Sequence, residues 1–174
     1  MANIYLFSGP CGCGKTTLTN AFAPTLNAPV YLIHGDDFQV GFVEAQNAGV
    51  PRVPWEDIHA FNWDCILYVA RRALTMGVDV VIDYIVEEEL PRVIALAGEF
   101  GATLHYVVLV ASEDTLRSRL QARGDAWLLD RSLFLRRLLK VKRENQGHLL
   151  DITGLSVQEE IEQVRAGHFS LDSI

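Results

Sequence analysis

The sequence contains no long uncharged apolar run, and this absence removes several classes of protein from consideration. A membrane-spanning helix needs roughly 18 to 20 consecutive apolar residues, so we expect no membrane partner. The first five residues, MANIY, carry no positive charge ahead of the apolar positions, which is unlike a secretion signal. These features predict a soluble protein located in the cytoplasm.

Cysteine and basic residues are also scarce. The chain has three cysteines, an odd number that does not suggest a disulfide framework, and Cys11 and Cys13 lack the second pair of a typical zinc site. Acidic residues outnumber basic ones, 22 to 15, which gives a formal net charge of −7. Because nucleic-acid binding depends on Lys and Arg that neutralise phosphates, this charge argues against a nucleic-acid partner. The basic residues are expected to cluster locally, around phosphates.

The chain has 174 residues, 49% of them apolar, and this length fits one domain covering residues 1–174. Short apolar runs alternate with amphipathic segments, which is typical of a parallel sheet with helices on both faces. Strands are expected at 4–7, 30–33, 78–82, 103–110 and 149–152. Helices are expected at 15–26, 56–76, 87–100, 112–122, from 131, and at 156–167, where Ser156 and Glu159 form a capping box. The pattern predicts a three-layer α/β domain.

Residues 9–16, GPCGCGKT, match the phosphate-loop pattern G-x-x-x-x-G-K-[ST] between a predicted strand and a predicted helix. The glycines allow backbone N–H groups to surround phosphate oxygens, Lys15 is expected to reach the β- and γ-phosphates, and Thr16 to ligate Mg²⁺. By average composition the pattern arises by chance in roughly one such chain in a hundred, and its position makes chance rarer still. We therefore predict that ATP and Mg²⁺ are bound. The nucleotide-binding residues of this segment are Gly9, Gly12, Cys13, Gly14, Lys15, Thr16 and Thr17.

Acidic residues follow two of the predicted strands. Asp36 and Asp37 come after the second strand and Asp83 after the third, and in open parallel sheets ligands bind at these carboxyl ends. A phosphotransferase needs one carboxylate to accept the proton of the attacking hydroxyl and another on the metal side. Single aspartates at such positions also cap helices or face solvent, and which of the three is the base stays open. His34 is expected to be packed or hydrogen-bonded rather than a base.

An arginine-rich segment reverses the acidic balance of the chain. Arg119, Arg123 and Arg131 flank residues 123–131, which are expected to form a lid, and guanidinium groups bind phosphate through paired hydrogen bonds. For the other arginines nearby, pairing with acidic neighbours or exposure to solvent is the better interpretation. These are Arg117, Arg136 and Arg137.

With these motifs in place, the chain resembles the small P-loop kinases related to shikimate kinase, gluconate kinase and chloramphenicol phosphotransferase. The resemblance implies the P-loop NTPase fold, a five-stranded parallel sheet in the order 2-3-1-4-5, Mg-ATP as donor and a small hydroxylated acceptor held by Asp36. It also implies that Arg119 or Arg123 lies by the adenine, that Arg131 acts from the lid, and that Thr153 lies along the adenine. The Asp-x-Asp pair of shikimate kinase is absent after the second strand, so the acceptor stays open.

Our interpretation is an ATP- and Mg²⁺-dependent phosphotransferase acting on a hydroxyl of a sugar acid, nucleoside or antibiotic, as a monomer or homodimer. The expected catalytic residues are Lys15, Asp36 and Arg131, and the expected metal-side residues are Thr16 and Asp83. Residues 38–55 form the expected acceptor-side loop, and acceptor binding is expected from Asp36, Asp37, Asp83 and Trp55. The alternatives are an ATP-dependent switch or ATPase, and a protein that sequesters a compound without modifying it.

Overall fold

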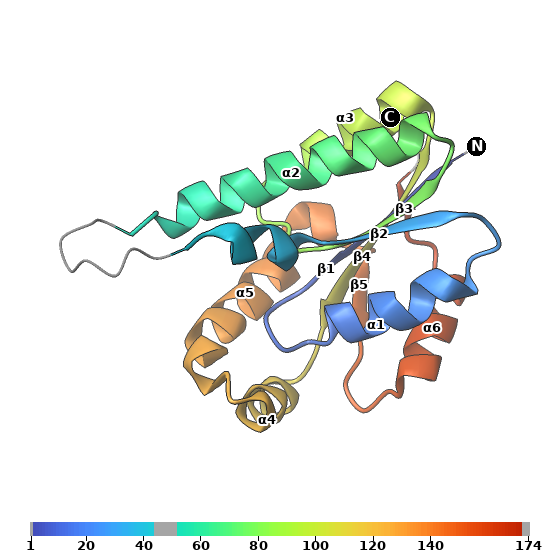
Figure 1. The fold of residues 1–174 in the computed structure, drawn as a ribbon. Helices are drawn as coiled ribbons and strands as arrows, with labels where there is room; N and C mark the ends of the chain where they lie inside the picture. Colours follow the sequence, from blue (N-terminus) through green and yellow to red (C-terminus); the bar gives the residue numbers. More distant parts are fainter. Residues whose placement is uncertain (1, 44–51, 172–174) are drawn as a thin grey trace.

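The computed structural model describes residues 2–43 and 52–171. These residues form a three-layer α/β structure with the sheet in the middle (Figure 1). The strands are β1 (Asn3–Ser8), β2 (Val30–His34), β3 (Asp79–Asp83), β4 (Thr103–Val110), β5 (Leu149–Asp151) and β6 (Ser170–Leu171). The helices are α1 (Lys15–Phe22), α2 (Trp55–Thr75), α3 (Leu90–Phe100), α4 (Glu113–Arg123), α5 (Leu129–Val141) and α6 (Val157–Ala166).

The sheet has the predicted strand order, β2-β3-β1-β4-β5, and all four pairings along this path are parallel. A sixth strand, β6, pairs antiparallel with the start of β4 and was not predicted. It has two residues, which is too short for an alternating pattern to be recognised. The parallel arrangement brings the carboxyl ends of β1, β2, β3 and β4 to one edge of the sheet.

Each face of the sheet buries its own apolar cluster, because successive strand residues point to opposite sides. Ile4 and Leu6 of β1 join residues of α2, α3 and α5, whereas Phe7 joins residues of α1 and α6. Figure 1 shows α2 and α3 on one side of the sheet and α1 and α6 on the other. Among the described residues, no helix is both long and apolar enough to cross a bilayer.

The helices begin and end near the capping residues of the sequence, and a few of the predicted helix boundaries are shifted. Ser112 caps α4 by accepting from the Thr115 N–H, and the Ser156 capping box at α6 is present as predicted. The helix predicted from residue 87 begins at Leu90 instead, because the Glu89 carboxylate accepts the backbone N–H groups of residues 87 and 88 and holds them in a turn. The helix predicted to end at residue 26 ends at Phe22, and a short 3₁₀ turn follows it.

The expected acceptor-side loop, residues 38–55, is only partly described. A 3₁₀ segment, Gly35–Gly41, follows β2, and α2 begins at Trp55. Residues 44–51 of this loop lie outside the described residues.

Candidate nucleotide and acceptor site

The phosphate loop joins β1 to α1 in the conformation that its glycines allow. Gly12 has φ +77° and Gly14 has φ +102°, values that L-residues with a side chain rarely adopt. A Cβ atom at Gly12 would also lie 2.8 Å from Cγ of Leu120 on α4, so neighbouring structure approaches the loop closely. The sequence requirement for glycine therefore has two local causes here, the backbone dihedral and the contact with α4.

Two side chains from α4 and α5 hold the loop from outside. Arg119 donates from Nη1 to the backbone oxygen of Cys13 at 2.6 Å, and Ser132 donates from Oγ to the backbone oxygen of Cys11 at 2.7 Å. Ser132 is fully buried, so its hydrogen bond is shielded from water. Arg119 was predicted to belong to the nucleotide site, whereas Ser132 was not recognised. Its contact with residue 11 spans 121 positions, and no local pattern marks it.

Lys15, Thr16 and Asp83 meet at the carboxyl ends of β1 and β3. The ammonium of Lys15 donates to the backbone oxygens of Gly9 at 2.9 Å and Pro10 at 3.3 Å. Thr16 donates from Oγ1 to Oδ2 of Asp83 at 2.6 Å, and the Asp83 side chain is only 4% exposed. The structure thus brings together the two residues expected on the metal side.

These two side chains fit Mg²⁺ by their chemistry, because Mg²⁺ prefers hydroxyl, carboxylate, water and phosphate oxygens. Within residues 2–43 and 52–171, no group of three or more His, Cys, Asp or Glu side chains is arranged to hold a metal ion. Mg²⁺ is usually held by one or two protein oxygens together with substrate phosphates.

His34 at the end of β2 completes this network. Its Nδ1 lies 3.0 Å from Oδ2 of Asp83, and its Nε2 lies 3.3 Å from Oδ1 of Asn20 on α1. His34 is therefore hydrogen-bonded, as predicted, and it shares the Asp83 oxygen with Thr16. The sequence did not indicate which side chain His34 contacts.

Asp36 and Asp37 lie in the 3₁₀ segment after β2, and both are exposed. Desolvation by the surrounding chain nevertheless raises the pKa of Asp36 above its usual value. Lys15 and Arg123 act in the opposite direction, whereas Asp83 and Asp37 raise the pKa further. The Asp36 carboxyl is thus within electrostatic reach of Lys15 in the phosphate loop and of Arg123.

The remaining predicted arginines occupy different surroundings. Arg123 pairs with Asp125 at 3.0 Å and is exposed. Arg131 pairs with Glu87, which follows β3, and its guanidinium lies 5.4 Å from the ring centroid of Phe134. Arg131 is thus held beside the carboxyl end of β3. Arg136 is one of the arginines for which pairing with acidic neighbours or exposure to solvent was expected. It donates from Nε to the backbone oxygen of residue 111 at 2.7 Å.

Thr153, expected beside the adenine, lies just after β5. Its Oγ1 accepts from the N–H of Ser112 at 2.8 Å, and this bond ties the loop after β5 to the start of α4. Both segments lie at the same edge of the sheet as the phosphate loop, because β4 runs parallel to β1 and β5 runs parallel to β4.

A polar and aromatic cluster on the acceptor side was missed by the sequence reasoning. Tyr84 directly follows Asp83, and its hydroxyl accepts from Nδ2 of Asn62 at 2.8 Å. His59 lies with Nδ1 3.4 Å from that hydroxyl and with Nε2 2.9 Å from Oε1 of Glu89. The sequence gives no signal for the partners in this cluster, because the contacts join α2 to the chain that follows β3. Trp55, which was predicted, has its ring centroid 6.0 Å from that of His59.

Comparison with known proteins assigns the family. Residues 4–145 match the family described as AAA domain. The chain belongs to this family. No curated protein matches the sequence.

Solved structures share the fold of this AAA-domain protein. The tunicamycin resistance protein of Deinococcus radiodurans is 19% identical, with 95% of each chain covered and a TM-score of 0.66. An APS kinase of Mycobacterium tuberculosis, in complex with AMPPNP and APS, is 17% identical, with 94% of this chain and 95% of that one covered and a TM-score of 0.62. A gluconokinase of Sinorhizobium meliloti is 20% identical, with 95% and 90% covered and a TM-score of 0.58. The P-loop kinase fold implied by the resemblance is confirmed.

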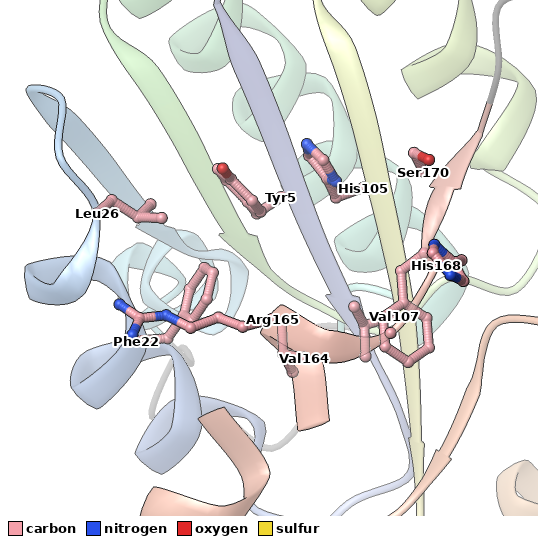
Figure 2. Close-up of a pocket in the computed structure, with 11 residues that line it drawn as sticks. Tyr5, Phe22, Leu26, His105, Val107, Val164, Arg165, His168 and Ser170 are labelled. Carbon is pink, nitrogen blue, oxygen red and sulfur yellow. The ribbon is translucent and has the colours of Figure 1, made fainter. Parts of the chain in front are cut away.

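A separate hollow of about 260 Å³ lies on the α1 and α6 face of this AAA-domain protein, near the start of β1 and β4. Figure 2 shows the rings of Tyr5 and His105 lying side by side on these two strands, and their centroids are 4.6 Å apart. Arg165 of α6 also lines the hollow. None of the residues predicted from the sequence to bind nucleotide or acceptor lines it.

Proposed function

We propose that this AAA-domain protein is an ATP- and Mg²⁺-dependent phosphotransferase that phosphorylates a hydroxyl of a small molecule. The observation that carries the proposal is the 2.6 Å hydrogen bond between Thr16 and Asp83, which joins the phosphate loop to a buried carboxylate at the adjacent strand end. Asp36 lies at the next strand end, where the charge of Lys15 reaches it. The printed names of the structural neighbours, among them a gluconokinase and an APS kinase, support the same reaction class.

The phosphate loop would bind the triphosphate through its backbone N–H groups and the start of α1. The loop residues assigned to nucleotide binding are Gly9, Gly12, Cys13, Gly14, Lys15, Thr16 and Thr17. Lys15 would leave its backbone acceptors and contact the β- and γ-phosphates, where its positive charge stabilises the transferring group. Arg119, Arg123 and Thr153 would border the adenine end, since all three lie beyond the loop on the α4 and β5 side.

Thr16 and Asp83 would hold Mg²⁺, with Asp83 acting directly or through a bound water. When bound, the ion neutralises charge on the β- and γ-phosphate oxygens. His34 supports this arrangement from β2, because its hydrogen bond to the same oxygen of Asp83 restrains the carboxylate.

Asp36 would act as the base. The acceptor oxygen attacks the γ-phosphorus in line, the bond from that phosphorus to the ADP oxygen breaks, and the hydroxyl proton passes to the Asp36 carboxylate. The raised pKa of Asp36 makes it a stronger proton acceptor than an ordinary aspartate. Asp37, Asp83 and Trp55 would border the acceptor together with the loop 38–55.

Arg131 would reach the transferring phosphoryl from the lid, residues 123–131. To do so its guanidinium must exchange Glu87 for phosphate oxygens, and the exchange is favourable because the pair is partly exposed and therefore weak. We assign these functions to one domain, residues 1–174, that works in the cytoplasm as a monomer or homodimer.

The first test measures ADP release by the purified protein with Mg-ATP and a panel of sugars, sugar acids, nucleosides and hydroxylated antibiotics. A compound that raises ADP release at least tenfold, with a new phosphate ester detected by mass spectrometry, would support the proposal. ATP binding without any stimulated release would instead favour a switch or a sequestering protein. ATP hydrolysis without an ester product would favour an ATPase.

A further inference from the structure

Tyr84, His59 and Trp55 form a row of aromatic rings, here called the stack, from the chain just after β3 to the surface of the acceptor side. The Trp55 ring is tilted by 36° to the ring of His59. Tyr84 is 2% exposed, and its ring lies 5.4 Å from His59 with an angle of 27° between the planes. His59 in turn lies 6.0 Å from Trp55, which is 45% exposed. A large aromatic ring this exposed at the start of α2 leaves a flat apolar surface next to the predicted acceptor loop.

The stack is fixed by hydrogen bonds rather than by packing alone. Burial would raise the pKa of Glu89, but hydrogen bonds from His59 and from the backbone N–H groups of residues 88 and 87 lower it. An ionised Glu89 accepts from Nε2–H of His59, which leaves Nδ1 as the acceptor that faces the Tyr84 hydroxyl. The Tyr84 ring is held on another side by Gly35, where a Cβ would lie 2.5 Å from it. Because these contacts fix the His59 ring beneath Trp55, stacking of a ligand on Trp55 would require little reorganisation.

The charges around the stack are mainly negative. Burial raises the pKa of Tyr84 to about 12, against a lowering effect of the hydrogen bond from Asn62. The nearby carboxylates of Asp36, Glu89 and Glu87 also raise this pKa. Arg131 is already paired with Glu87. Lys15, whose charge reaches Asp36, is assigned to the nucleotide phosphates, and Arg123 is paired with Asp125. An anionic acceptor would add negative charge beside several carboxylates and be repelled.

Lys142 does not reverse this balance. It binds the side chain of Glu88 at 2.7 Å and the backbone oxygen of Glu87. A neutral or cationic acceptor meets no such repulsion.

Unpaired oxygen atoms point to the same class of ligand. Among the described residues, the buried side-chain polar atoms without a hydrogen-bond partner are Oε1 of Gln39 and Oδ1 of Asn62. Both lie on elements that border the acceptor side, the 3₁₀ segment after β2 and helix α2. Carbonyl oxygens accept hydrogen bonds, so a ligand group that satisfied them would be an O–H or N–H donor and not an anionic group.

We propose that the acceptor is a neutral or cationic hydroxylated compound with a flat aromatic part that stacks on Trp55, and that sugar acids and other anionic acceptors are excluded. The inference rests on the proposed function, because it describes the acceptor of the same reaction. It narrows the acceptor to classes such as nucleosides and aromatic amino alcohols.

Binding measurements test the inference independently of catalysis. The full chain with Mg²⁺ and AMPPNP is titrated with adenosine, uridine and 2-amino-1-phenylethanol, and in parallel with glucose and gluconate, followed by saturation-transfer NMR. At least one aromatic probe should bind at least tenfold more tightly than gluconate. Trp55→Ala should weaken it about tenfold, Trp55→Phe should restore most of the affinity, and Tyr68→Ala should leave it unchanged. Tyr68 is an exposed ring on the same helix, and 13 positions separate it from Trp55.

The inference would be overturned if gluconate bound more tightly than the aromatic probes, if no probe bound, or if Trp55→Ala behaved like Tyr68→Ala. Failure of the proposed function looks different. Aromatic probes would bind in a Trp55-dependent manner, yet mass spectrometry would detect no phosphate ester when ATP replaced AMPPNP.

Discussion

Thr16 at the start of α1 and Asp83 at the end of β3 are separated by 67 residues, yet a 2.6 Å hydrogen bond joins Oγ1 of the threonine to Oδ2 of the aspartate. The contact exists because β1 and β3 are parallel neighbours whose carboxyl ends meet at one edge. Through this hydrogen bond the buried Asp83 carboxylate belongs to the phosphate-loop region. No local sequence motif contains both residues.

Asp83→Asn should weaken Mg²⁺ binding while leaving metal-free ATP binding nearly unchanged. The amide keeps the shape of the side chain, but it loses the charge that attracts the cation and the acceptor oxygen shared by Thr16 and His34. We expect the Mg²⁺ concentration for half-maximal ATP binding to rise about 10- to 100-fold. Calorimetric titration of ATP at several Mg²⁺ concentrations measures this.

The matched control for this change is Asp79→Asn. Asp79 is a buried carboxylate at the opposite end of the same strand, where it accepts from the backbone and side chain of Asn3 at 2.8 and 3.1 Å. Its replacement should lower stability without changing the Mg²⁺ dependence. Equal shifts in Mg²⁺ dependence for both variants would show that Asp83 has no specific metal role.

Asp36→Asn should abolish phosphoryl transfer while nucleotide binding persists, because an amide cannot accept the hydroxyl proton. In the unchanged protein the base must be ionised, so activity should fall as the pH falls through the Asp36 pKa. Since that pKa is raised, the fall should occur at higher pH than for an ordinary aspartate. A pH profile of kcat/KM measures it, with Asp64→Asn as the control, since Asp64 is an exposed carboxylate that pairs with Arg92. Transfer that survived in Asp36→Asn would rule out Asp36 as the base.

Gly12→Ala should lower ATP affinity at least tenfold. The substitution places a Cβ at φ +77° and 2.8 Å from Leu120, so the loop must shift away from the conformation that surrounds the phosphates. Gly77→Ala is the control, since Gly77 has a similar φ of +72° but no atom within 4 Å of the added Cβ. It should cost about 1 kcal/mol of stability and leave ATP affinity intact. Equal ATP affinities of the two variants would contradict the prediction.

The sequence predicted the phosphate loop and the five main strands well because both depend on local patterns, whereas the strand order was implied by the family resemblance. Residues 9–16 carry their own signature, and the strands alternate regularly with helices. The contacts of Ser132 with the loop and of His59 with Glu89 were not predictable, because they join separate elements and the residues fit ordinary helix positions. Glu89 was assigned to the body of a helix, whereas its side chain organises the turn before that helix.

Arg131→Ala should lower kcat about a hundredfold or more while the Kd for ATP changes little, because a guanidinium on the transferring phosphoryl acts mainly in the transition state. Arg131→Lys should recover only part of the loss, since an ammonium lacks the planar pair of donors. Arg92→Ala is the control. Arg92 pairs with Asp64 on the surface of α2 and α3, and its loss should change neither constant.

Glu87→Gln separates a catalytic role of Arg131 from a structural one. Both partners of the Arg131 pair are partly exposed, at 38% and 21%, so the pair contributes little to stability, about 0 to 1 kcal/mol. If Arg131 must leave Glu87 to reach the phosphoryl group, weakening the pair should maintain or raise kcat. If the pair serves only to hold α5 beside β3, Glu87→Gln and Arg131→Ala should lower kcat and the melting temperature together. Stopped-flow turnover and thermal denaturation of the two variants therefore decide between these roles.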